Sequence, residues 1–105
     1  MIRHIVFFTA KAENVDEVRA GLSMLTANPH ASLLEIGTNV KTDQWGTDVD
    51  LVVYGEFEDE AALAAYKAHP IYHKSTETVR PIREVRIAAD YNCDTAVKTP
   101  LQPLP

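Results

Sequence analysis

The stretch Ile-Arg-His-Ile-Val-Phe-Phe-Thr, residues 2–9, decides the fold of this chain. β-Branched and aromatic residues predominate in it and Pro and Gly are missing, so it predicts a β-strand. Alternate side chains of a strand point to opposite faces of a sheet. Both faces are apolar here, with Ile2, Val6 and Phe8 on one and Ile5 and Phe7 on the other. Such a strand must be covered twice, by helices on one side and by another layer on the other.

The rest of the chain supplies the neighbours of this strand. Hydrophobic periodicity predicts a helix, two strands, a helical region and a last strand, at residues 14–28, 32–40, 49–57, 58–80 and 83–91. Asn14 is the predicted N-cap of the first helix, and Pro70 divides the second helical region. Gly55 inside a strand indicates a bulge or a close approach of another group. The order β-α-β-β-α-β predicts a ferredoxin-like α+β fold, with an antiparallel four-stranded sheet and helices on one face.

The length of 105 residues suits a single domain. We expect the ferredoxin-like domain to span residues 1–92. Residues 93–105 contain three of the six prolines and show no periodicity. This segment therefore predicts a proline-rich tail that is extended or disordered.

The second sheet face predicts self-association. The helices can cover only one face of the sheet. The other face, which carries Ile5 and Phe7, would expose a contiguous apolar patch to water. A second copy packed sheet to sheet would bury that patch. The sequence therefore predicts a homodimer through the open sheet face, which forms a dimeric α/β barrel.

Composition argues against several other partners and sites. The net charge of −5 and the lack of a basic face argue against nucleic acid. Apolar runs such as Ile5–Phe8 are too short to span a membrane, and we expect no secretory signal. Cys93 is the only cysteine, and His30 has no second ligand at metal spacing, so no metal site and no cofactor are predicted. We expect a cytoplasmic protein.

Ring side chains gather in two places, at His4 and in the segment from Tyr66 to His73. Tyr66 and Tyr72 lie on helix faces that are predicted to face the sheet. A phenol and an imidazole beside one pocket can polarise a carbonyl and accept a proton. The candidate catalytic residues are His4, Tyr66 and His73. The candidate ligand pocket is lined by Val6, Phe8, Tyr66, His69 and Tyr72.

Each of these residues also has a structural interpretation. His4 and Tyr66 can be core residues, and His69 before Pro70 can cap a helix. His73 shares a stripe of alternating charge with Glu77 and Arg80, which is typical of a solvated surface. Glu84 and Arg86 share one face of the last strand, and we expect them to form structural ion pairs with each other or across the dimer.

As a set, several segments resemble the stress-responsive α/β-barrel (Dabb) family. They are residues 1–8, Asn14-Val-Asp-Glu-Val, the run from Glu56 to Tyr66, His69-Pro70, and the closing residues 79–82 and 90–91. The resemblance covers residues 1–92 and implies a ferredoxin-like protomer and a homodimeric barrel. Most members have no assigned reaction, and some plant members are associated with stress.

Within the family, the chain is distantly similar to the olivetolic acid cyclase branch, which closes polyketide rings without a cofactor. That resemblance implies a substrate-positioning role for Tyr66 and matches His4 and the pair His69-Pro70. The position of the branch's catalytic histidine falls on Tyr72. His73 lies one residue further along, rotated by about 100° around the helix.

Three functions therefore stay open. The first is a homodimer of unassigned reaction that holds a small, mainly apolar ligand between sheet and helices. The second is a cofactor-independent enzyme of the polyketide cyclase or isomerase type, with a histidine base and Tyr66 on the carbonyl oxygen. The third is a structural or protein-binding dimer without catalysis, in which the tail at residues 99–105 serves for docking.

Overall fold

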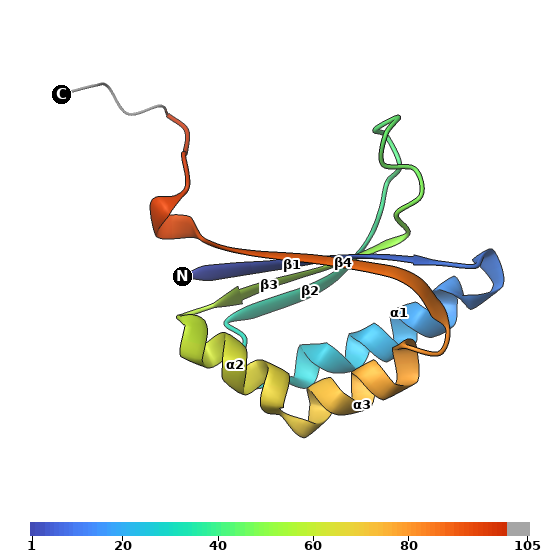
Figure 1. Ribbon diagram of the computed structural model, residues 1–105, viewed down its shortest axis with the longest axis horizontal. Coiled ribbons are helices and arrows are strands. Elements are labelled where there is room, and N and C mark those ends of the chain that lie inside the picture. The colour runs from blue at the N-terminus through green and yellow to red at the C-terminus, as the bar shows by residue number, and fades with distance from the viewer. Residues whose placement is uncertain (101–105) are drawn as a thin grey trace.

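The computed structural model of this protein describes residues 1–100. Four strands form one antiparallel sheet in the order β2-β3-β1-β4, and three α-helices lie on one side of it (Figure 1). The ferredoxin-like α+β fold is thereby confirmed. The elements are β1 (Ile2–Ala10), α1 (Val15–Ser23), β2 (Leu33–Thr38), β3 (Leu51–Phe57), α2 (Glu60–Ala68), α3 (Pro70–Val79) and β4 (Arg83–Asn92).

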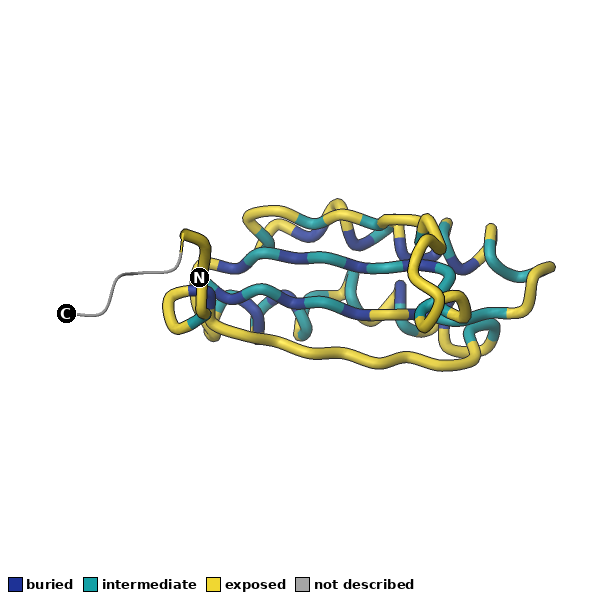
Figure 2. The backbone as a smooth tube through the Cα atoms, turned by 90° about the horizontal axis from the view of Figure 1, so that it is seen from above, coloured by how far each residue is buried: buried dark blue, intermediate teal, exposed yellow. Residues whose placement is uncertain are grey.

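The core lies between the sheet and the helices. Residues of β1 and β3 alternate along the strand between buried side chains and partly exposed ones (Figure 2). Leu51, Phe57 and Val18 are fully buried. The helix-facing side of β1 carries Ile2, Val6 and Phe8, as the alternation predicts, with the imidazole of His4 among them.

Side-chain caps set the helix boundaries around the second helical region. The carboxylate of Asp59 accepts a hydrogen bond from the Ala62 N–H at 2.8 Å and begins α2. His69 ends α2 in an extended conformation, because the following Pro70 disfavours helical backbone there. Pro70 then occupies the first turn of α3, where a missing N–H costs nothing.

Asn14 occupies the N-cap position of α1, as predicted, but its side chain does not cap the helix. A short 3₁₀ helix, Ala12–Asn14, precedes α1, so Asn14 already has helical backbone angles and its side chain makes no capping bond.

The segment predicted to be an extended or disordered tail begins with ordered structure. Cys93–Thr95 forms a 3₁₀ helix, and the Cys93 N–H donates to the Met1 carbonyl at 2.9 Å. Residues 101–105 of that tail lie outside the described part of the chain.

The face of the sheet opposite the helices carries an exposed apolar row. Phe7 pairs with Val52 of β3 and with Ile87 of β4, so three apolar side chains form a row across three strands. Phe7 is 41% exposed and Ile87 is 61% exposed. Strand β4, at the sheet edge, is exposed along almost its whole length (Figure 2).

Among residues 1–100, none of the helices has the length and apolar composition needed to cross a lipid bilayer.

A bulge interrupts the pairing of β1 with β4. Phe8 lies opposite Arg86, whereas Ala10 lies opposite Arg83. Two residues of β4 therefore face the single residue Thr9, whose hydroxyl oxygen accepts a hydrogen bond from the Val85 N–H at 3.0 Å. A bulge of this kind shifts the alternation of side chains beyond it.

The side chains of Phe57 and Leu34 pack closely against Gly55 of β3. A Cβ at this position would lie 2.8 Å from Cε2 of Phe57 and 3.0 Å from Cδ1 of Leu34. Gly55→Ala should therefore lower the free energy of unfolding by about 1–3 kcal/mol through overpacking. Chemical denaturation measures this loss.

The matched control is Gly37→Ala on β2. Its added Cβ would meet only the Val52 carbonyl oxygen, at 3.9 Å, and should change stability far less. Equal losses in the two variants would contradict the close approach at Gly55.

Candidate functional site

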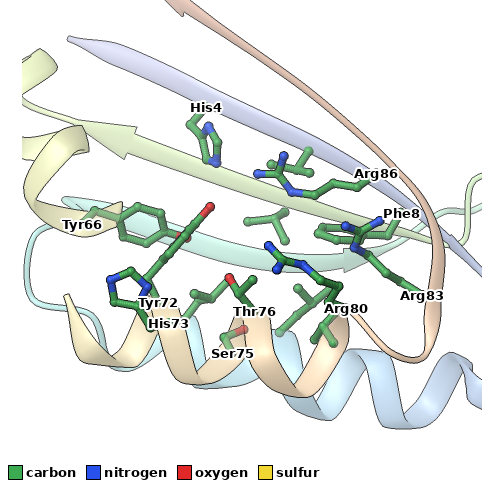
Figure 3. A pocket seen from close by; sticks show the side chains of 15 residues that line it. His4, Phe8, Tyr66, Tyr72, His73, Ser75, Thr76, Arg80, Arg83 and Arg86 are labelled. Atoms are coloured by element: carbon green, nitrogen blue, oxygen red, sulfur yellow. The ribbon is translucent and has the colours of Figure 1, made fainter. Parts of the chain in front are cut away.

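A cavity of about 360 Å³ lies between the sheet and the helices (Figure 3). Residues of β1, α2, α3 and the start of β4 contribute most of its wall. Its volume is within the range usual for small-molecule sites. The lining residues are His4, Val6, Phe8, Leu22, Leu25, Val53, Tyr66, Tyr72, His73, Ser75, Thr76, Val79, Arg80, Arg83 and Arg86.

His4 lies at the inner end of this pocket and is held by an acid on the neighbouring strand. The register of β1 with β4 places His4 opposite Asp90, and Nδ1 of His4 lies 2.5 Å from Oδ1 of Asp90. A carboxylate only accepts hydrogen bonds, so Nδ1 carries the proton. The other ring nitrogen, Nε2, then keeps its lone pair, and it points into the pocket (Figure 3).

Burial lowers the pKa of His4 below its usual value of 6.5. The hydrogen bond to Asp90 acts in the opposite direction, and the positive charges of Lys67 and Arg86 add to the lowering. Lys67 also approaches Asp90, with its Nζ 3.9 Å from Oδ2. At neutral pH the imidazole is therefore uncharged and able to accept a proton.

Two phenols face this imidazole. The ring centroid of Tyr66 lies 6.1 Å from that of His4 and 5.2 Å from that of Tyr72. The hydroxyls of both tyrosines turn toward the middle of the pocket (Figure 3). Burial raises the pKa of Tyr66, and the nearby Tyr72 raises it further. The Tyr66 phenol thus stays protonated and can donate a hydrogen bond to a ligand oxygen.

Packing around Tyr66 holds its ring in place. Its centroid lies 4.8 Å from that of Phe57, in an edge-to-face arrangement. The buried side chain of Asn28 donates to the Tyr66 carbonyl at 3.0 Å and ties the end of α2 to the loop before β2. On the opposite wall, the Ser75 hydroxyl donates to the Gly21 carbonyl at 2.8 Å and joins α3 to α1.

The structure brings most of the predicted residues together, with one clear exception. The residues that line the pocket as predicted are His4, Val6, Phe8, Tyr66, Tyr72 and His73. His69 does not reach it. Its Nδ1 accepts a hydrogen bond from the Ile71 N–H at 3.1 Å, so this ring caps α3. Its ring packs near that of His30, with a centroid distance of 5.7 Å.

His73 lies at the rim of the pocket. Its side chain is exposed, in agreement with the stripe of charged residues to which it belongs, and its ring packs beside Tyr72 rather than toward His4 (Figure 3). The predicted ion pair of Glu84 with Arg86 is not among the ion pairs of residues 1–100. Arg86 lines the pocket instead.

Sequence reasoning missed Asp90 and the pocket roles of Arg80, Arg83 and Arg86. The sequence pattern that could have indicated Asp90 is its position in the last strand, on the same face as His4 once the two strands pair.

Among residues 1–100, no group of three metal-ligating side chains is close enough to hold a metal ion.

The lowered pKa of His4 predicts a pH dependence of stability. The native state binds fewer protons at His4 than the unfolded state, so the free energy of unfolding should fall as the pH drops through 6.5 toward the lowered native pKa. His4→Phe should show a weaker decline over this window in denaturation measured at several pH values. The exposed His30 is the control, and His30→Gln should follow the wild type. An equal decline in His4→Phe and wild type would contradict the assignment.

Comparison with known proteins places this chain in a family. The profile of the Stress responsive A/B Barrel Domain (Dabb) family matches residues 2–93. A comparison with curated proteins found no match. The similarity to the olivetolic acid cyclase branch stays a prediction.

Solved structures share the fold. A Dabb family protein with a ferredoxin-like fold from Mesorhizobium loti is 25% identical, with 87% of this chain and 94% of that chain covered and a TM-score of 0.71. A dimeric ferredoxin-like protein of unknown function from a Jannaschia species is 19% identical, with 87% and 97% covered and a TM-score of 0.77. A protein described as an antibiotic biosynthesis monooxygenase is 17% identical, with 89% and 98% covered and a TM-score of 0.67. Because the family profile spans nearly all of the described residues, the chain belongs to the stress-responsive A/B barrel (Dabb) family.

Proposed function

We propose that this Dabb protein binds a small molecule with an apolar body in the pocket between sheet and helices, and transfers a proton at a carbon next to its carbonyl group. The observation that carries the proposal is the hydrogen bond between Asp90 and the buried His4, which lines the pocket. A neutral imidazole oriented by a carboxylate is the arrangement that general-base catalysis requires. The reaction needs no cofactor.

The proposed step uses three side chains. His4 Nε2 accepts a proton from the carbon next to the ligand carbonyl, and the electron pair of the broken C–H bond moves to the carbonyl oxygen. Tyr66 donates a hydrogen bond to that oxygen, which stabilises the enolate. Asp90 accepts from Nδ1 and stabilises the imidazolium, which later returns the proton to carbon. Asp90 is thus a positioning residue.

His4 is a better candidate for the base than His73. His4 is only 1% exposed, and its ring faces Tyr66. His73 is exposed at the rim, and its ring packs beside Tyr72. Water around an exposed imidazole competes with the substrate and weakens any stabilisation of the charges that develop.

The proposal includes a homodimer. The row formed by Phe7, Val52 and Ile87 is part of an apolar face without cover in a single copy. Sheet-to-sheet packing of two copies would bury it and leave the pocket, on the helix side, accessible. The Jannaschia neighbour is described as dimeric, which supports this arrangement.

The lone buried thiol of Cys93 supports a reducing compartment such as the cytoplasm.

Exchange of α-protons for deuterium tests the reaction. Acetophenone and ethyl benzoylacetate are incubated with the protein in D₂O, and the loss of the α-proton signal is followed by NMR. Exchange should be faster with wild type than in buffer, and His4→Gln should reduce the enhancement by about 100-fold. Tyr66→Phe should also reduce it, because the enolate loses its donor. Asp90→Asn should cause a smaller loss and shift the pH profile.

The exposed His30 again supplies the control, and His30→Gln should exchange protons like the wild type. A larger loss in His73→Gln than in His4→Gln would assign the base to His73. Wild-type rates in both Tyr66→Phe and His4→Gln would rule out these two residues as the catalytic groups. A wild-type rate equal to that in buffer would leave a binding or structural dimer as the function.

Light scattering tests the dimer. The particle in solution should have twice the chain mass of 11.7 kDa. Ile87→Lys, which places a charge in the proposed interface, should shift the mass toward one chain. Lys98→Glu in the segment after β4 is a control that should remain dimeric. A wild-type particle of 11.7 kDa at high concentration would contradict the proposed barrel.

A further inference from the structure

Three arginines line one end of the pocket and surround the turn between α3 and β4. Arg80 follows the last residue of α3, Arg83 begins β4, and Arg86 lies opposite Phe8. In Figure 3 the guanidinium groups of Arg80 and Arg86 reach toward the middle of the pocket, and Arg83 lies beside Phe8. A chain with a net charge of −5 thus concentrates three positive charges at one site.

The bulge in β4 makes this concentration possible. Regular alternation would send Arg83 to the open face of the sheet, together with Val85 and Ile87. Because two residues of β4 face Thr9, Arg83 lies opposite Ala10 and Arg86 lies opposite Phe8. Both arginines therefore share the helix side of the sheet. Bulges next to functional sites often re-aim a side chain in this way.

These arginines have no acidic partner within the described chain. The ion pairs among residues 1–100 all involve other groups. Arg83 makes only a long contact, 3.4 Å, to the main-chain oxygen of Glu84. Three like charges beside one cavity repel one another unless an anion lies between them. Guanidinium groups bind carboxylate and phosphate oxygens with two parallel hydrogen bonds each.

Apolar side chains form part of the remaining wall, beside the polar Ser75 and Thr76. Val6, Leu22 and Val53 are buried and line the pocket between the arginines and the His4–Tyr66 end. A ligand that fills this space therefore needs an apolar body with a charged group at one end.

We propose that the pocket selects small molecules that carry an oxyanion, a carboxylate or phosphate group, on an apolar body, and that Arg80, Arg83 and Arg86 bind this group. The inference deepens the proposed function and rests on it, because the bound anion would position the carbonyl end of the substrate at His4.

Calorimetric titration with three matched probes tests the inference. The probes are 1-naphthoate, 1-naphthyl phosphate and the neutral 1-naphthamide, at one fixed ionic strength. At least one anionic probe should bind wild type tenfold or more tightly than the amide. Arg80→Gln and Arg86→Gln should each remove most of this preference, and the tighter anion identifies the oxyanion. Equal binding of the amide and both anions would overturn the proposal.

Arg19→Gln is the matched control. Arg19 lies on α1, outside the pocket, and its Nη1 contacts Asp16 at 2.6 Å. This variant should keep the wild-type preference for anions. The same loss of preference in Arg19→Gln would show a general charge effect and overturn the proposal.

Thermal unfolding provides a second measurement that needs no organic ligand. At low ionic strength Arg86→Gln should raise the melting temperature, because it relieves repulsion within the cluster. Arg19→Gln, which loses an ion pair, should not raise it. A lower melting temperature of Arg86→Gln would indicate a structural ion-pair role and overturn the inference.

Different results would contradict the proposed proton transfer and the proposed anion site. Acetophenone is neutral, so its proton exchange tests His4 without the arginines. Absence of any anion preference, together with His4-dependent exchange on acetophenone, would remove this inference and leave the proposed function standing. Anion preference without exchange would leave the arginine site and remove the reaction.

Discussion

The antiparallel pairing of β1 with β4 is the constraint on which the site depends. These strands come from opposite ends of the domain, and their register decides which side chains meet. One register position places Asp90 against His4, and another places Arg86 against Phe8. A shift of one residue would turn Asp90 and Arg86 to the open face. The acid that orients the base and the cation at the other end of the pocket therefore depend on the same ladder of main-chain hydrogen bonds.

Local patterns in the sequence predicted the fold well. Period-two alternation located β1, β3 and β4, and Pro70 located the boundary between α2 and α3. The same alternation predicted the apolar open face that contains Phe7. These features depend on neighbours along the chain, which a pattern of residues records directly. Asn14 holds the predicted N-cap position without a side-chain capping bond, because a 3₁₀ turn precedes the helix.

The site was only partly predictable, for a physical reason. His4, Tyr66 and Tyr72 were found because their residue types and helical or strand faces are visible locally. Asp90 and Arg83 were not, because strand register and the bulge at Thr9 determine their positions. His69 illustrates the reverse error, since its closeness to Tyr66 in sequence indicated a pocket residue. The extended backbone before Pro70 turns its ring to the α3 N-terminus instead.

The exposure of β4 has a consequence for how this protein would lose the proposed activity. β4 is an edge strand, and almost all of its side chains are exposed in a single copy. Segments with few buried contacts detach in local openings that need less free energy than global unfolding. Fraying of β4 would separate Asp90 from His4 and withdraw Arg86 while the other three strands stay folded. Gentle heating of an isolated protomer would thus abolish the proposed reaction before the helices melt, and association that covers β4 would protect it.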